Sequence, residues 1–188
     1  SLTEQAYSIL RSRLLSCDLR PGAEVSELAL SRELGMSKTP VREALGRLAL
    51  EGFVVAIPRR GYRVLPISLS YVEELFTVRR ALEGTAAELA ADRIAPAEVE
   101  RLGKLARVTY LRQEKQSLET FIAVNRDFHM SIAHASGVPR LAALVEAHLD
   151  EAARLLFLSA QTLDITPDTI DGHLSIVEAL ERRCPVEA

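Results

Sequence analysis

The sequence contains no tryptophan, and only 5% of its 188 residues are aromatic. Its two cysteines, Cys17 and Cys184, lie near opposite ends, which argues against a disulfide framework or a cysteine zinc site and fits a reducing cytoplasm. No apolar run of about 18 residues occurs, and no cationic segment followed by an apolar stretch opens the chain, so we expect neither a membrane span nor a signal peptide. A cytoplasmic globular protein with one or two cores is the expected class.

The charged residues are distributed unevenly along the chain. The net charge of −3 by itself argues against a nucleic-acid-binding protein. Residues 1–66 contain ten Lys and Arg against seven Asp and Glu, a net of +3, whereas residues 67–188 contain thirteen against nineteen, a net of −6. A basic first part and an acidic second part indicate two domains, 1–66 and 67–188, with different partners.

Helical periodicity and turn residues organise the basic part. A first helix is expected before the turn at Pro21–Gly22, and a second, short helix begins at the N-cap Ser26. The apolar residues assigned to this short helix are Leu28, Ala29 and Leu34. Gly35 then ends it, and Ser37 caps a third helix that has Pro40 in its first turn. Two helices joined by a tight glycine-containing turn are typical of a helix-turn-helix motif.

The helix that begins near Lys38 has two different faces. Its apolar arc consists of Val41, Ala44, Leu45 and Leu48. Its opposite arc consists of Thr39, Arg42, Glu43 and Gly46. A long cation and a small hydroxyl one turn apart suit guanine edges, a thymine methyl group or phosphate in a major groove. The alternative, from this stretch alone, is an amphipathic helix whose arginine is merely solvated.

Two short β-rich runs follow Gly52. They are FVVAI and YRVL, and they flank the turn sequence PRRG, which predicts a hairpin. A hairpin directly behind a helix-turn-helix makes a winged helix. Arg59, Arg60 and Gly61 would form the tip of the wing, where cations and a permissive backbone can approach a minor groove or phosphates.

The stretch LRPGAEVSELALSRELGMSKTPVREALGRLALEGFV resembles the winged-helix domain of the GntR family of bacterial regulators, with TPVREAL followed by RL and EG as its specific signature. The resemblance implies that Lys38, Thr39, Arg42 and the wing Gly61 contact double-stranded operator DNA. Some members have an arginine at the position of Leu28, so a base contact supplied there would be missing from this chain. The complete set of predicted DNA-binding residues is Arg32, Ser37, Lys38, Thr39, Arg42, Arg47, Arg60 and Gly61.

From Ser70 onward, helical periodicity continues almost to the end of the chain. The apolar stripe of the helix expected at about 70–92 consists of Leu75, Leu82, Ala86 and Leu89. Arg79 lies on this stripe, with Glu83 one turn beyond it. Because burying a cation costs several kcal/mol unless it is paired, Arg79 is either the ion-pair partner of Glu83 or a bidentate anchor for an anionic ligand.

An asparagine and two histidines are candidate metal ligands. Asn125 and His129 lie four residues apart in a helix expected at about 118–135, so an oxygen and an imidazole nitrogen could share one ion. The apolar stripe of that helix is Phe121, Val124, Phe128 and Ile132, with Met130 pointing outward. His173 lies among apolar residues of the last helix, so a second imidazole points inward. The alternative is a set of hydrogen-bonded core histidines.

The stretches LFTVRRALEGTAAELAA, NRDFHMSIAHASG and DGHLSIVEAL resemble the all-helical FCD ligand domain of the FadR-type GntR subfamily. Many members hold a divalent metal with an Asp or Asn and three His, and bind a small carboxylate effector above it. Asn125, His129 and His173 match three of these ligands, and the resemblance implies Zn²⁺, Ni²⁺ or Mn²⁺. The fourth would come from a helix that should begin where the sequence stops, at PVEA, so the sequence is expected to be part of a longer protein.

We therefore predict a mostly α protein, with an N-terminal winged helix-turn-helix followed by an antiparallel helical bundle. The predicted function is a metabolite-responsive transcription regulator, not an enzyme, that acts as a homodimer on operator DNA and binds a small organic acid at Arg79. Two alternatives stay open from the sequence. One is a metal-dependent hydrolase, against which no Asp or Glu is predicted beside the Asn125 and His129 pair as a general base. The other is a DNA-binding module with a purely structural bundle.

Overall fold

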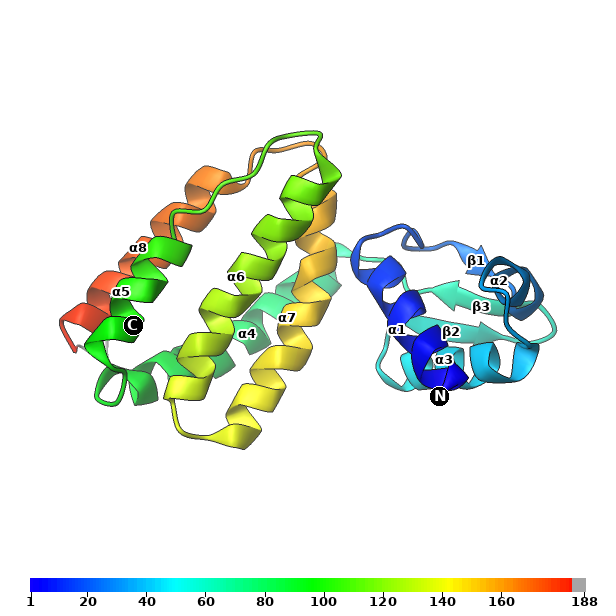
Figure 1. Cartoon of the computed structure of the whole chain (residues 1–188), viewed down its shortest axis with the longest axis horizontal. Helices are drawn as coiled ribbons and strands as arrows, with labels where there is room; N and C mark the ends of the chain where they lie inside the picture. Colours follow the sequence, from blue (N-terminus) through cyan, green and yellow to red (C-terminus); the bar gives the residue numbers. More distant parts are fainter. Residues whose placement is uncertain (184–188) are drawn as a thin grey trace. The chain divides into compact units, whose positions relative to one another are not determined.

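The computed structural model describes residues 1–183 and divides the chain into two compact units, Ser1–Val72 and Glu73–Ala188 (Figure 1). Cys184 and the PVEA end, where a further helix was expected, lie outside the described residues. The first unit is a winged helix and the second is a bundle of helices, which confirms the predicted fold class. Within the described residues, no helix is long and apolar enough to cross a membrane.

Three helices build the N-terminal unit: α1 (Leu2–Leu15), α2 (Glu27–Glu33) and α3 (Lys38–Leu50). The inward arc predicted for α3 is confirmed, because all four of its residues are buried. One core joins the three helices to the wing, and its buried residues are Ala6, Leu10, Leu14, Leu19, Leu30, Val41, Ala44, Leu45, Leu48, Phe53, Val54 and Val64. This core fixes the outward face of α3 relative to α2 and the wing.

A three-stranded antiparallel sheet forms the wing, with the strand order β1-β3-β2. The predicted hairpin is β2 (Val54–Ile57) and β3 (Gly61–Val64), paired so that Ile57 lies opposite Gly61. The first strand, β1 (Glu24–Val25), was not predicted. It has only two residues, and it pairs with β3 rather than with a neighbour in sequence, so no local pattern identifies it.

Helix α2 has the predicted cap, but the residues that it buries are not the apolar ones named for it from the sequence. Ser26 does cap the helix, since its hydroxyl accepts a hydrogen bond from the Ala29 amide at 3.0 Å. However, Leu28 and Ala29 are exposed, and Leu30 and Ser31 are buried instead. A helix of seven residues has only two turns, so its apolar residues fit more than one rotation about the helix axis, and packing on α3 selects one of them.

The described part of the helical unit contains five helices: α4 (Leu69–Ala91), α5 (Pro96–Leu105), α6 (Lys115–Ala135), α7 (Pro139–Ser159) and α8 (Thr166–Glu181). The helices α6 and α7 are joined by a short turn and run side by side in opposite directions (Figure 1). Helix α7 was not predicted from the sequence as a separate helix.

Helix α6 is covered on two sides, which explains one wrong burial prediction. On one side Phe128 and Ile132 join the buried residues of α4, α5 and α8. On another side Met130 packs with buried residues of α4 and α7 and is itself buried, although it was predicted to point outward. Leu89, assigned to the inward stripe of α4, is 36% exposed. A helix in the middle of a bundle needs more than one apolar face, and a single-stripe interpretation misses this.

Candidate DNA-binding surface and effector cavity

The start of α3, the start of α2 and the wing enclose a hollow of about 480 Å³ in the N-terminal unit. Lys38, Arg59, Arg60 and Gly61 line it together with Glu27. Three predicted DNA contacts, Lys38, Arg60 and Gly61, are thereby brought to one surface. The side chains of Lys38, Arg59 and Arg60 are exposed there. A cationic, concave surface beside an exposed helix start has the charge and the backbone donors that phosphate contacts need.

Arg42 is exposed on α3 and is held by a carboxylate. Its Nε atom donates to both Glu27 carboxylate oxygens at 2.9 and 3.1 Å, and Nη2 lies 2.8 Å from Oε2. Glu27 is the first residue of α2, so this contact bridges the two helices of the motif. No role was predicted for Glu27 from the sequence. The turn joins the end of α2 to the start of α3, so the approach of Glu27 to Arg42 depends on how the two helices cross and not on the spacing in the sequence.

The remaining predicted DNA contacts lie in different surroundings. Thr39 and Arg32 are exposed on α3 and α2. Ser37 is the N-cap of α3, yet its side chain makes no capping hydrogen bond, so the cap predicted from its hydroxyl is wrong in this detail. Arg47 is not brought to the hollow. Its guanidinium lies 3.7 Å from the centre of the Tyr7 ring and 3.0 Å from Glu4, both on α1.

Gly61 is required by the packing of the wing. Its φ angle is +116°, in the region that favours glycine, and a Cβ atom placed there would lie 2.4 Å from the Val25 carbonyl oxygen. The contact joins the start of β3 to β1. Any role of Gly61 on DNA is therefore additional to a structural requirement.

A chain of polar contacts crosses the helical unit from α4 to α8. Arg79 donates from Nε to Glu83 Oε1 at 2.6 Å, and Glu83 Oε2 lies 2.7 Å from Nδ1 of His129 on α6. Nε2 of His129 lies 3.2 Å from Nε2 of His173 on α8. The His173 ring stacks on Phe128 with 4.0 Å between ring centres. The structure thus confirms the Arg79 and Glu83 ion pair and the inward position of both histidines.

Burial and neighbouring charges set the protonation of this chain of contacts. Burial opposes ionisation of Glu83, but the hydrogen bond and positive charge of His129, followed by those of Arg79, lower the pKa of the carboxyl to about 2. Burial, reinforced by positive charge at His129, lowers the pKa of His173 to about 3. At neutral pH Glu83 is therefore a carboxylate, and His173 is a neutral imidazole with a free lone pair.

A cavity of about 270 Å³ opens beside these contacts. Arg79, Arg80, Glu83 and His129 form its polar wall, and Phe76 lies at the same end, 5.3 Å from the Arg79 guanidinium carbon. Apolar or small residues form the rest of the lining: Gly84, Ala86, Ala87, Ile132, Ala133, Val145 and Ile176. A cavity with one cationic end and an apolar body suits a small molecule that carries an acid group.

The two histidines have the spacing expected of ligands to one ion. Two nitrogens bound to a tetrahedral metal at about 2.0–2.1 Å lie about 3.3 Å apart, close to the 3.2 Å between the Nε2 atoms. The Glu83 carboxylate on the far nitrogen of His129 is the usual outer partner of such a ligand. Asn125 lies one turn before His129 and is half-buried, but it takes no part in the contacts that join the histidines. Within residues 1–183, no three His, Cys, Asp or Glu side chains converge as a metal site.

The expectation that no acidic residue accompanies the histidines is wrong. Glu83 reaches His129 from a different helix, 46 positions earlier in the sequence, so spacing within α6 does not indicate it. Both of its oxygens are engaged, one by Arg79 and one by His129. Because the carboxylate is held by two donors and has a pKa of about 2, it is a poor general base.

A winged helix with an exposed cationic surface, followed by a separate helical unit, is the architecture of a DNA-binding transcription regulator. Comparison with known families agrees with this class. Residues 2–64 match the family described as bacterial regulatory proteins, gntR family, and residues 74–188 match the FCD domain. The chain belongs to the GntR family, in the group that carries an FCD domain. This is a family of transcription regulators and not of enzymes, and the hydrolase alternative has no support.

Individual relatives cover much of the chain. It is 35% identical over 146 residues to the HTH-type transcriptional regulator McbR of Escherichia coli K12, an alignment that covers 78% of this chain and 66% of that protein. It is 27% identical over 182 residues to the HTH-type transcriptional repressor RspR of the same strain, covering 97% and 80%. The solved structure of E. coli McbR/YncC superposes with a TM-score of 0.79 at 29% identity, covering 100% of this chain and 89% of that one.

Proposed function

We propose that the protein is a metabolite-responsive transcription regulator. It binds double-stranded operator DNA through the winged helix and a small organic acid through the cavity of the helical unit. The observation that carries the effector half of this proposal is the position of Arg79 in the wall of the 270 Å³ cavity. A structural bundle gains little from keeping an arginine beside an open cavity, because the desolvation of a cation opposes folding.

The guanidinium of Arg79 has donors to spare for a ligand. Its Nε atom engages Glu83, and within residues 1–183 no hydrogen bond or ion pair engages its two terminal amino groups. These amino groups can donate to a carboxylate, and the apolar lining receives the body of the acid. A cavity of this volume favours an acid of few carbons over a long acyl chain.

A divalent ion, Zn²⁺, Ni²⁺ or Mn²⁺, belongs to the proposal as a cofactor. His129 and His173 would hold it, with Asn125 as a further ligand, and when bound it supplies a second positive anchor for the acid. Nδ1 of His129 donates to Glu83, so in the neutral form of the ring the lone pair available to a metal ion is on Nε2, the atom nearest His173.

A homodimer is the proposed functional form. A two-fold pair of winged helices matches a palindromic operator, in which each copy reads one half-site. The two winged helices of the dimer have two arrangements, and one of them fits the half-sites less well. The acid releases DNA by binding more tightly to the dimer in that arrangement, and this difference in acid affinity is all that the switch requires.

The test of this proposal is replacement of Arg79. We expect Arg79→Ala to abolish release of DNA by the cognate acid while operator binding without acid stays nearly unchanged, because the winged helix is untouched. Arg79→Lys should restore the response poorly, since an ammonium group cannot reproduce the planar fork. Candidate acids are screened by thermal shift, and binding is then measured by calorimetric titration of each folded variant.

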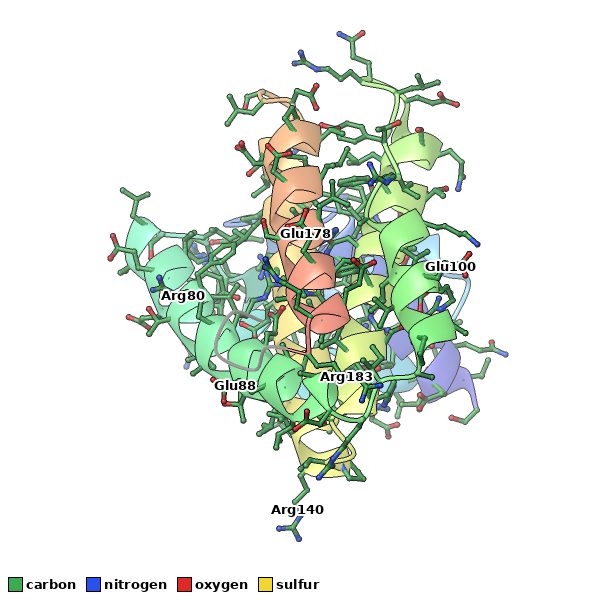
Figure 2. All side chains as sticks on the ribbon, turned by 90° about the vertical axis from the view of Figure 1, so that its left-hand side faces the viewer. Arg80, Glu88, Glu100, Arg140, Glu178 and Arg183 are labelled. Atoms are coloured by element: carbon green, nitrogen blue, oxygen red, sulfur yellow. The ribbon has the colours of Figure 1, made fainter. Side chains whose placement is uncertain are left out.

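Arg140→Ala is the matched control, because Arg140 is exposed at the start of α7 and projects away from the bundle (Figure 2). It removes the same charge and should leave acid binding unchanged. Undiminished acid binding by Arg79→Ala would refute the anchor role. If Arg79 serves only as the partner of Glu83, then Arg79→Ala and Glu83→Gln should both destabilise the fold, and neither should alter acid binding.

A further inference from the structure

Glu83 touches both proposed binding groups of the cavity, Arg79 and His129. Its Oε1 atom accepts a hydrogen bond from Nε of Arg79 at 2.6 Å, and its Oε2 atom lies 2.7 Å from Nδ1 of His129. The side chain is only 20% exposed. A half-buried carboxylate with one donor on each oxygen holds both donors in fixed orientations.

The contact with His129 decides which ring nitrogen carries the proton. A carboxylate oxygen can only accept, so Nδ1 of His129 must donate to it. In the neutral ring the other nitrogen, Nε2, then has a lone pair, and this is the atom that lies 3.2 Å from Nε2 of His173. Without Glu83 the proton could move to Nε2, where it would block metal binding.

We propose that Glu83 is the positioning residue that joins the acid-binding and metal-binding parts of the cavity. It fixes His129 with Nε2 free for a metal ion, and it orients the Arg79 guanidinium with its terminal amino groups free for the acid. This inference rests on the proposed function and adds a residue to it. The contacts run from the acid through Arg79, Glu83 and His129 to the metal ion. Binding of the acid therefore affects binding of the metal ion, and the reverse, through the side chain of Glu83.

Glutamine at position 83 separates this role from simple packing. It keeps the shape of the side chain but replaces one of the two acceptor oxygens with an amide nitrogen that only donates. Because Arg79 and His129 contact different oxygens of Glu83, one of the two contacts is lost in the observed geometry. We expect Glu83→Gln to bind Zn²⁺ about 10- to 100-fold more weakly than the wild type, the usual effect of removing an outer partner of a metal-bound histidine. Zn²⁺ alone is the probe, measured by competition with a chromophoric chelator.

The matched control is Glu88→Gln. Glu88 is exposed on the outer side of the same helix (Figure 2), so this variant removes one carboxylate from α4 without touching the cavity. It should bind Zn²⁺ as the wild type does. Equal weakening by both substitutions would overturn the proposal, because it would show a general effect of charge.

A second measurement does not depend on metal. Long-range proton–nitrogen NMR of the metal-free, full-length protein identifies the protonated nitrogen of the His129 ring. We expect only the Nδ1-protonated form in the wild type and both forms in Glu83→Leu, with Glu83→Gln as the substitute if the leucine variant does not fold. If wild-type His129 carries its proton on Nε2, or if its form is the same in every variant, the positioning role is refuted.

These two measurements also distinguish the inference from the proposed function beneath it. Failure of the wild type to bind Zn²⁺ removes the cofactor from the proposed function, while the NMR result still decides whether Glu83 fixes His129. Normal Zn²⁺ binding by the wild type together with undiminished binding by Glu83→Gln leaves the proposed function standing and removes Glu83 from it.

Discussion

The buried imidazole of His173 should make the helical unit lose stability as the pH falls. His173 is only 7% exposed, and burial together with positive charge at His129 lowers its pKa from 6.5 to about 3. In the unfolded chain the imidazole takes up a proton as the pH falls through 6.5. In the folded protein it does so only near 3. Between these values the unfolded state binds one more proton, so the free energy of unfolding decreases as the pH decreases.

The expected magnitude follows from this difference in pKa. Below the unfolded pKa of 6.5, the extra proton of the unfolded state removes about 1.4 kcal/mol of stability per pH unit. Lowering the pH from about 7.5 to about 5 covers about 1.5 units of this range, so it should remove roughly 2 kcal/mol through His173 alone. His173→Gln lacks this proton. Its free energy of unfolding should therefore fall by about 2 kcal/mol less than that of the wild type over the same range.

Urea unfolding followed by circular dichroism at several pH values, on protein freed of metal by a chelator, measures the difference. The control is His134→Gln, which removes an imidazole that is exposed near the end of α6. The comparison uses the change with pH in each protein, so a constant loss of packing in His173→Gln cancels. Parallel curves for the wild type and His173→Gln would refute the reasoning, since they would mean that His173 titrates alike in both states.

Two further predictions concern the winged helix. Arg42→Ala should weaken operator binding roughly 5- to 100-fold and relax one base preference, because Arg42 is exposed on the outward face of α3. Operator affinity is measured by fluorescence-anisotropy titration, and an unchanged affinity would remove α3 from its assigned role. Gly61→Ala should lower the melting temperature, because the added Cβ meets the Val25 carbonyl oxygen, whereas Gly46→Ala, in α3 with nothing within 4 Å of the added Cβ, should be neutral or stabilising. Equal melting temperatures for the two alanine variants would contradict this account of Gly61.

Patterns within a single element predicted much of the fold. The inward arc of α3 was correct because thirteen residues give enough turns to fix one apolar face. The seven residues of α2 do not, and the residues that it buries, Leu30 and Ser31, are not among the apolar residues named for it from the sequence. Strand β1 was missed because it consists of two residues that pair with a segment nearly forty positions away. Local periodicity fails where the deciding contact is distant in the sequence.

The same distinction separates the predicted and missed parts of the cavity. Arg79 and Glu83 lie four residues apart on one helix, and their pairing was foreseen as one of two possibilities. His129 and His173 were expected to face inward, but their 3.2 Å approach depends on how α6 and α8 pack. The contact of Glu83 with His129 was not foreseen at all. A glutamate already paired on its own helix gives no sign in the sequence that its second oxygen meets another helix.

Two arginines on α3 take different directions because of the way the helix packs. Arg47 follows Arg42 by five residues, which rotates it by about 140° around the helix axis. That rotation turns Arg47 toward α1, where it lies over Tyr7 and beside Glu4, whereas Arg42 turns toward α2 and meets Glu27. Arg47 therefore ties the second half of α3 to α1. We expect base reading to fall to the first half, where Thr39 and Arg42 are exposed beside the cationic hollow.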